Sequence, residues 1–467
     1  MRTIIIVILC CVFTGLHVSS QTRKMGRNIS ERFIEETDTA TIIRQSLNES
    51  PDGKTIAYVA RKNHRQFAVI QGKQQKDYEG VGTSGIIFSS NGKRTAYLAR
   101  NGSQYFAVVD GREQERYEGL GTDPVFSLDG KTIAYVAIQN ERQFLVVNGK
   151  ELKHYEGIGL RGPIFSPNNK HLVYVIVEKE KFFLVRDEKE GKKYDNIAMN
   201  TITFSPNGNR LAYVATLAGK ILFVLDGKEQ RTFAVRTEAP PVFSRDSKHL
   251  AYVAAEGNSM FVVHDGKAGK RYSSIAERSL IFSRNGTTLS YIAQTNNKWC
   301  VVINGKEDAL YENIGINTLS MSPSGKRTAY VAIAGIKRFV VVDGVAGKQY
   351  DAIPEGNPVF SPDSKRLAYM AQSNGMWNVV IDGIEGKAYR NIRAGTLKFS
   401  PDSKHVVYAA SVGDKMSVIM DDSEGKPFDE ILTRGEGKIV FDSPTRFHYL
   451  AAKENKIYFV EEQLKPE

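Results

Sequence analysis

Hydrophobic positions in this chain recur as short clusters separated by polar turns. Between residues 84 and 122, apolar stretches alternate with the turn pairs Asn91-Gly92 and Asp110-Gly111. Such pairs between apolar runs are strong signals for two-residue β-hairpins. A polar stretch follows the second hairpin. The pattern therefore predicts four antiparallel strands in this unit: a (85–88), b (94–100), c (105–109) and d (113–117).

The unit repeats along nearly the whole chain, and a Tyr in strand b marks each copy. The markers are Tyr58, Tyr97, Tyr135, Tyr174, Tyr213, Tyr252, Tyr291, Tyr330, Tyr369, Tyr408 and Tyr449. Tyr58 and Tyr408 are 350 residues apart, which makes nine steps of about 39 residues. A period of this size indicates a solenoid, a propeller or a helical array. Four short strands per period and no sustained helical periodicity favour propeller blades.

The repeats predict an all-β fold, a β-propeller of about 10–11 four-stranded blades over residues 42–467. The last copy has stretches for strands a, b and c but none for d. Residues 30–36, within an N-terminal segment at 21–41, are similar to a strand d, so we expect them to close the ring. The even spacing favours one continuous ring. Two fused propellers are the alternative, because eleven blades exceed the usual four to eight.

The N-terminus has the pattern of a signal peptide. Arg2 precedes an apolar run from Ile4 to Phe13, and Val18 and Ser20 suit a cleavage site after Ser20. We therefore expect residues 1–20 to be removed and the protein to be periplasmic or secreted. The apolar run is short for a membrane span, so none is expected after cleavage. An uncleaved anchor is the alternative.

Composition and charge argue against several classes of protein and of partner. Of the 467 residues, 41% are hydrophobic and 25% are charged, which argues against a disordered or polytopic membrane protein. The net charge of +11 comes largely from Lys residues in the a–b and c–d turns, which are predicted to share one face. Acidic residues such as Glu113, Glu151 and Glu229 lie near them, and no aromatic residues are interspersed for base stacking. No nucleic-acid partner is therefore expected.

A recurrent phrase links the repeats to a known family. Ser50-Pro51-Asp52-Gly53-Lys54 is followed by Ala57-Tyr58, and residues 360–371 carry a close copy. The pattern resembles the TolB-like, WD-repeat-like family of β-propeller repeats over about residues 42–462. The resemblance implies an exported bacterial protein that binds other macromolecules. Similar repeats precede the hydrolase domain of prolyl-oligopeptidase-type enzymes, but this sequence has no Gly-x-Ser-x-Gly elbow.

Few residues suggest metal, cofactor or covalent chemistry. Cys300 is the one cysteine beyond the predicted signal peptide, and its apolar strand predicts a core position. His171, His249 and His405 occupy one repeat position in different copies, so they cannot surround one ion. The spacings of zinc, calcium and phosphate sites do not occur. We expect no metal, no cofactor and no catalytic residue.

The candidate binding residues lie in the d–a loops, which vary in sequence and are predicted to emerge with the b–c loops on the second face. A constant scaffold with one variable face is how loops provide binding specificity. The charged candidates are Arg161, Arg236, Glu238, Glu277, Arg278, Glu355, Arg393 and Arg434. Trp299 and Trp377 open strand c in their copies and are candidate anchors. Variation without function in the loops, and core packing for the Trp residues, are the alternatives.

The sequence favours a non-catalytic exported scaffold that binds a protein or an envelope polymer through its variable face. The alternative is a propeller enzyme, a glycan lyase or hydrolase, with its site at the central channel. Such an enzyme needs converging acid–base groups or a metal. The strand-a residues expected to line the channel are mainly apolar, for example Ile86, Val125 and Ile164. This composition favours binding.

Overall fold

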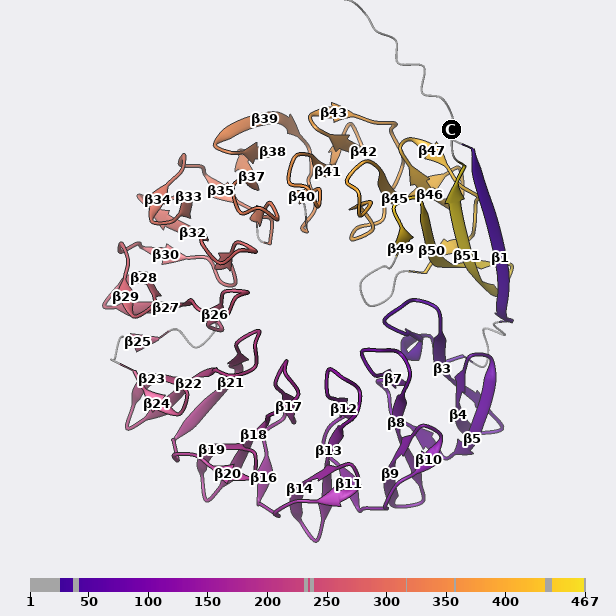
Figure 1. Ribbon diagram of the computed structural model, residues 1–467, viewed down its shortest axis with the longest axis vertical. Helices are drawn as coiled ribbons and strands as arrows, with labels where there is room; N and C mark the ends of the chain where they lie inside the picture. The colour runs from indigo at the N-terminus through magenta and orange to yellow at the C-terminus, as the bar shows by residue number, and fades with distance from the viewer. Residues whose placement is uncertain are drawn as a thin grey trace, which may run out of the picture.

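The computed structural model describes residues 26–36, 42–230, 234–235, 239–315, 317–356, 358–432 and 439–465. These residues form eleven antiparallel sheets that follow one another around a single ring (Figure 1). The prediction of an all-β propeller is confirmed, with eleven blades in one ring rather than two fused rings. We number the blades 1 to 11 in chain order. Among the described residues no helix is long and apolar enough to cross a membrane, and the helical turn η1 covers Arg44–Ser46.

A hairpin of strands b and c forms the centre of each blade. The b strands are β3 (Ile56–Lys62), β8 (Thr95–Asn101), β13 (Ile133–Gln139), β18 (Leu172–Glu178), β22 (Leu211–Leu217), β27 (Leu250–Glu256), β32 (Leu289–Thr295), β37 (Thr328–Ala334), β41 (Leu367–Ser373), β45 (Val406–Val412) and β50 (Arg446–Lys453). The c strands are β4 (Arg65–Ile70), β9 (Gln104–Val109), β14 (Arg142–Val147), β19 (Lys181–Arg186), β23 (Lys220–Leu225), β28 (Ser259–His264), β33 (Lys298–Ile303), β38 (Lys337–Val342), β42 (Met376–Ile381), β46 (Lys415–Met420) and β51 (Lys456–Leu464).

The outer and inner strands flank this hairpin. The d strands are β5 (Lys73–Tyr78), β10 (Arg112–Glu113), β15 (Lys150–Glu151), β20 (Lys189–Glu190), β24 (Lys228–Glu229), β29 (Lys267–Ala268), β34 (Lys306–Glu307), β39 (Val345–Tyr350), β43 (Ile384–Glu385), β47 (Ser423–Glu424) and β1 (Arg27–Glu36). The a strands are β2 (Asn48–Glu49), β6 (Gly80–Val81), β7 (Ile87–Phe88), β11 (Gly119–Leu120), β12 (Val125–Phe126), β16 (Gly157–Ile158), β17 (Ile164–Phe165), β21 (Asn196–Phe204), β25 (Ala234–Val235), β26 (Val242–Phe243), β30 (Ser274–Ile275), β31 (Ile281–Phe282), β35 (Asn313–Ile314), β36 (Ser320–Met321), β40 (Val359–Phe360), β44 (Lys398–Phe399), β48 (Glu430–Ile431) and β49 (Val440–Ser443).

Strand a is interrupted, which the sequence did not predict. In blade 7, β30 and β31 both pair with β32, and a turn separates them. In this turn the Ser279 hydroxyl donates to the carbonyl of Ala276 and accepts the N–H of Ile292 at 3.1 Å. The hydroxyl thus replaces a missing strand-to-strand hydrogen bond. Residues 276–279 therefore form a turn between two segments of strand a, whereas the sequence placed them in the loop between strands d and a.

The recurrent Ser-x-Asp phrase forms the a–b turn. In blade 3, the buried Ser127 donates its hydroxyl to the Asp129 carboxylate at 2.6 Å and accepts the N–H of Thr132. Asp129 also accepts the N–H of Lys131. These hydrogen bonds, led by the one from Ser127, hold the pKa of Asp129 below its ordinary value. The Ser-x-Asp motif recurs because it supplies the side-chain hydrogen bonds of the a–b turn.

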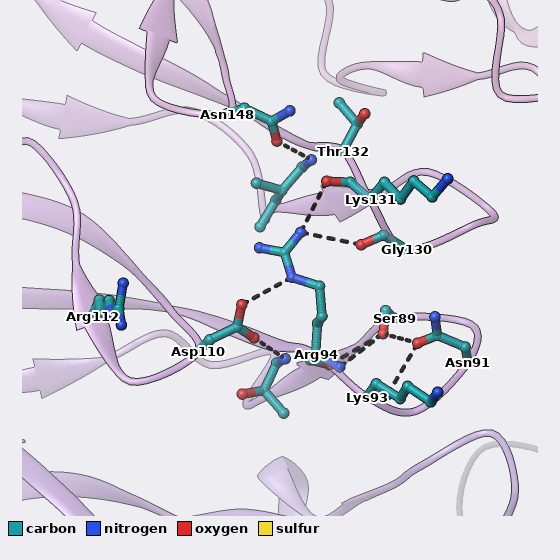
Figure 2. Close-up of polar contacts among 12 residues, drawn as sticks. Ser89, Asn91, Lys93, Arg94, Asp110, Arg112, Gly130, Lys131, Thr132 and Asn148 are labelled. Carbon is teal, nitrogen blue, oxygen red and sulfur yellow. Dashed lines mark hydrogen bonds and ion pairs between the residues drawn. The ribbon is translucent and has the colours of Figure 1, made fainter.

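Neighbouring blades are joined by an Arg that reaches across their interface (Figure 2). The Arg94 Nε donates to Asp110 at 2.9 Å, and its Nη1 donates to the carbonyls of Gly130 and Lys131 in the next blade. The guanidinium also lies over the ring of Phe126, 5.1 Å from its centroid. Arg210, Arg327 and Arg366 form the same pair with an Asp, and His171, His249 and His405 take the place of Arg in blades 4, 6 and 10.

Aromatic contacts and ion pairs connect the outer parts of the blades. The marker Tyr97 is buried and packs edge-on against Tyr78 of the preceding blade, so it contributes to the packing between blades. Farther out, Lys76 donates to Glu113 of the next blade at 2.6 Å. The same Lys–Glu pair recurs as Lys153–Glu190, Lys192–Glu229, Lys270–Glu307, Lys348–Glu385, Lys387–Glu424 and Lys426–Glu31.

The two ends of the chain meet in blade 11. The strand β1 pairs antiparallel with β51, with Ser30 opposite Glu461 and Phe33 opposite Tyr458. The strand therefore takes the place of the missing strand d, and it lies at the outer edge of the last blade (Figure 1). Its Glu31 supplies the acid for the Lys–Glu pair between blades 10 and 11.

Candidate functional site

The turns that interrupt strand a position several of the candidate residues. In blade 7 the N–H of Ser279 bonds to the carbonyl of Ala276, which leaves Glu277 and Arg278 at the tip of the turn. Arg278 has a φ of +58°, in the left-handed region. Glu277 and Arg278 therefore lie in the turn between β30 and β31.

A cavity of about 610 Å³ lies beside this turn, where blades 6, 7 and 8 meet. This volume is within the usual range of ligand pockets. Its apolar wall includes Val253 and Met260 of blade 6, Ile292 of blade 7 and Ile314 of blade 8. Its polar lining includes Glu277, Arg278 and Asn317. The cavity combines a mostly apolar wall with a few polar groups, which is typical of binding pockets.

The same cavity contains one of the two Trp residues. Trp299 lines it and is partly buried against the core shared by blades 7 and 8. Arg278 is exposed and makes no hydrogen bond or ion pair within the described part of the chain. The structure therefore brings together three residues that the sequence singled out, Glu277, Arg278 and Trp299. Of these, Arg278 has a positive charge available to a ligand.

Glu355 and Trp377 occur together at a smaller cavity of about 390 Å³ between blades 8 and 9. Arg338 and Pro354 are also part of its lining. This cavity repeats the arrangement of the first one two blades later, with a charged residue from a strand-a turn beside a Trp from strand c. It is smaller, and Arg338 of strand c supplies its positive charge.

The side chains of Arg161 and Arg393 form hydrogen bonds to the next blade. Arg161 donates to the carbonyls of Met199 and Ile202 in blade 5, at 2.5 and 3.1 Å. Arg393 donates to Glu430 of blade 11 at 3.3 Å. Both side chains therefore help to join neighbouring blades. The remaining candidates, Arg236, Glu238 and Arg434, lie outside the described residues.

One cluster of side chains was not anticipated from the sequence. His249, His264 and Asp265 of blade 6 have ligand atoms within 4.8 Å of one another. Burial alone would raise the pKa of Asp265, but the hydrogen bonds from His249 and the Leu250 N–H, with the charges of both His residues, hold it below its ordinary value. The available signal was His264 itself, 15 residues after His249, at a position where most copies have an aliphatic residue.

Comparisons with known proteins concern the fold. No family model and no curated protein matches the sequence. A crystal structure of a eukaryotic initiation factor is similar with a TM-score of 0.39 and 12% identity, over 70% of this chain and 97% of that one. A crystal structure of TolB from Acinetobacter baumannii has a TM-score of 0.25 and 16% identity, over 64% of this chain and 77% of that one. These similarities give no information about a ligand.

Proposed function

We propose that this propeller is a non-catalytic binding scaffold whose main contact site is the cavity between blades 6, 7 and 8. The observation that carries the proposal is the convergence of Arg278 and Trp299 on a mostly apolar cavity. Trp and Arg are the residues that most often dominate binding energy, especially beside well-packed apolar surface. The eleven-bladed ring supports this role because it holds the turns of strand a on a rigid frame.

The cavity fits a short apolar segment of another protein that ends in, or lies beside, an acidic group. The apolar part would contact Ile292, Ile314 and Trp299, and the acid would pair with Arg278. A charge-assisted hydrogen bond to Arg is stronger than a neutral one. An envelope polymer with carboxylate groups is the other outcome, and identification of the captured ligand distinguishes the two.

The exported location is also part of the proposal, and it rests on the sequence of residues 1–20. Cell fractionation tests it directly. The protein should appear outside the cytoplasm with Gln21 as its first residue. A protein that retains Met1 in the cytoplasm would contradict this location, although it would leave the binding site unaffected.

Affinity capture from an envelope extract, with mass spectrometry, tests the binding site. Arg278→Ala and Trp299→Ala should each reduce capture of a specific partner at least about tenfold, as expected for residues that dominate an interface. Arg245→Ala is the matched control, since this exposed Arg lies in the a–b turn of blade 6, outside the cavity. Equal capture by all variants would reject the site. Turnover of a glycan or peptide panel by the purified protein would reject the non-catalytic role.

A further inference from the structure

The c–d turn of blade 6 brings two imidazoles and a carboxylate together. The His249 Nδ1 is 2.6 Å from the Asp265 Oδ2, and the His264 Nε2 is 3.6 Å from the same oxygen. The two imidazole rings are 5.7 Å apart between centroids. Three potential ligand atoms, from the end of β28 and from the a–b and c–d turns, therefore converge on one point.

Other blades show that this cluster is more than the usual contact between blades. His171 and His405 pair with their Asp partners at the same 2.6 Å distance. The residue before the Asp is Arg186 in blade 4 and Met420 in blade 10, and neither is a second imidazole. Within the described residues, blade 6 alone groups three such ligands. The contact between blades requires one His, so it does not account for His264.

The hydrogen bonding leaves the His264 Nε2 without a partner, whereas the His249 Nδ1 and the Asp265 Oδ2 are bonded to each other, so an ion held by both would replace the proton between them. Asp265 accepts the N–H of Leu250 with its Oδ1, so its Oδ2 is the oxygen that faces the imidazoles. The His264 Nε2 is shielded from solvent and has no hydrogen-bond partner. Buried polar atoms are nearly always paired, and an unpaired one calls for a specific explanation. The ring of Phe282 packs near both imidazoles and restricts their movement.

The geometry points to a binding site for a divalent transition-metal ion of the Zn²⁺ class, held by the His249 Nδ1, the His264 Nε2 and the Asp265 Oδ2. Tetrahedral zinc, with bonds of about 2.0–2.1 Å, places neighbouring ligand atoms about 3.3 Å apart. The 2.6 and 3.6 Å separations lie on either side of that value, and all three ligand atoms lie within 4.8 Å of one another, so side-chain rotations would bring them to the spacing of a tetrahedral site. Imidazole and carboxylate ligands without thiolate suit Zn²⁺, Ni²⁺ or Cu²⁺. Three protein ligands leave a coordination position open to water or to a ligand group.

The repeats provide variants that should keep the fold. His264→Val introduces the residue found at this position in blades 2, 3 and 8, namely Val109, Val147 and Val342. His249→Arg restores the Arg–Asp pair of blades 2, 5, 8 and 9. The control is His405→Arg, which makes the same replacement in blade 10, where there is no second His. All four proteins should carry no polyhistidine tag.

Calorimetric titration with ZnCl₂ tests the site, using the chain from Gln21 onward. The unaltered protein should bind one ion, and His264→Val or His249→Arg should weaken binding at least about 100-fold, since loss of an outer-shell partner alone costs about 10–100-fold. His405→Arg should bind like the unaltered protein. The Tm should rise with Zn²⁺ only in the proteins that bind it.

Three outcomes would overturn the proposal. They are absence of stoichiometric binding to the unaltered protein, unchanged binding by His264→Val, and equal weakening by His405→Arg. Equal weakening by His405→Arg would mean that the ion binds to His–Asp pairs in several blades rather than to the cluster in blade 6. Melting curves recorded without metal show whether each variant is folded. A variant that melts at a far lower temperature without metal would show that its replacement residue is not compatible with blade 6. In that case, Co²⁺ absorption spectra of the unaltered protein test the ligand set independently.

Discussion

Arg27 and Glu462 form a buried ion pair, 2.9 Å long, between strands at opposite ends of the chain. The two residues are 435 positions apart, and both side chains are almost fully buried. Arg27 also donates to the carbonyls of Val418 and Met420 in blade 10, and Glu462 accepts the Tyr449 hydroxyl. Burial and the Glu462 charge raise the pKa of Tyr449 well above its ordinary value, so it remains a donor. This network holds the closing strand to the ring.

Removal of Arg27 should therefore be strongly destabilising. Arg27→Met leaves the Glu462 charge buried without its cationic partner, and breaking a buried pair in this way costs about 3–5 kcal/mol. The loss should appear as a lower urea midpoint. Arg27→Met combined with Glu462→Met should recover much of it, because apolar replacement of both partners is often neutral.

The partly exposed pair between Lys426 of blade 10 and Glu31 of the same closing strand provides the control. Lys426→Met should cost at most about 1 kcal/mol, because ion pairs open to solvent contribute little. If Arg27→Met and Lys426→Met shifted the midpoint equally, the buried network would not be what secures the ring. If the double substitution were as unstable as Arg27→Met, the unpaired Glu462 charge would not explain the loss.

The contact between blades should tolerate replacement only in matched pairs. Blades 2 and 3 fill the same two positions with Arg94 and Asp110, and with Thr132 and Asn148. The Asn148 side-chain oxygen accepts the N–H of Ile133, as Asp110 does for Thr95. Asp110→Asn alone places an amide against the Arg94 guanidinium and should cost about 1 kcal/mol.

Arg94→Thr combined with Asp110→Asn copies blade 3 and should be less destabilising than the sum of the single replacements. We expect a coupling free energy of about 0.5–1 kcal/mol in a double-mutant cycle measured by urea unfolding. Strict additivity would contradict the paired role. It would also mean that the contacts from Arg94 to Gly130 and Lys131 act independently of Asp110.

The strands that the sequence predicted well are those defined by local signals. Strands b and c are bounded by Asn-Gly and Asp-Gly turns, and the marker Tyr repeats at even intervals. The sequence did not predict the turns that interrupt strand a, because a side chain supplies one of their hydrogen bonds. Ser279 replaces a ladder bond, and a polar residue among small ones has the pattern of an ordinary loop. Local composition therefore specifies the hairpins but not the interruption of strand a.

The candidate site was also predictable only in part, because local sequence identifies variable residues but not their contacts with the next blade. Variation among the copies identified Glu277, Arg278 and Trp299, which the fold then brings to one cavity. The same argument selected Arg161, which donates to the Met199 and Ile202 carbonyls instead. Those carbonyls lie about 40 residues away in the next blade. Contacts of that kind depend on how the ring curves, and a single repeat does not specify them.

The Lys–Glu pairs between blades contribute stability that should be lost in acid. The Lys hydrogen bond is the largest cause that holds the pKa of Glu113, Glu190, Glu307 and Glu385 below their ordinary 4.5. A carboxyl whose pKa is lower in the folded state contributes stability above its unfolded pKa. That contribution is lost as the pH falls through the folded value. The urea midpoint should therefore fall as the pH decreases from about 5 to 3.

One pair can be removed to test this dependence. Glu190→Gln should reduce the slope of stability against pH in that range, because the substituted amide does not titrate. Glu180→Gln, at an exposed b–c turn of the same blade, is the control and should leave the slope nearly unchanged. High salt should weaken the effect, since the pairs are exposed. An identical slope for both variants would exclude the Lys–Glu pairs as its source.

Cys300 should be unreactive in the folded protein. Its side chain is fully buried in β33, and burial raises the pKa of the thiol to about 11. At pH 8 only about one thiol in a thousand would then be ionised, and the thiolate is the reactive form. In a chain that begins at Gln21, Cys300 is the one thiol, so an Ellman's reagent assay reports on it alone. The folded protein should release almost no chromophore within minutes, and guanidinium should release one equivalent. Rapid reaction without denaturant, at a rate near that of free glutathione, would show that the interface between blades 6 and 7 opens. It would contradict the tight packing of Cys300 with Val262 and Tyr291 in this core.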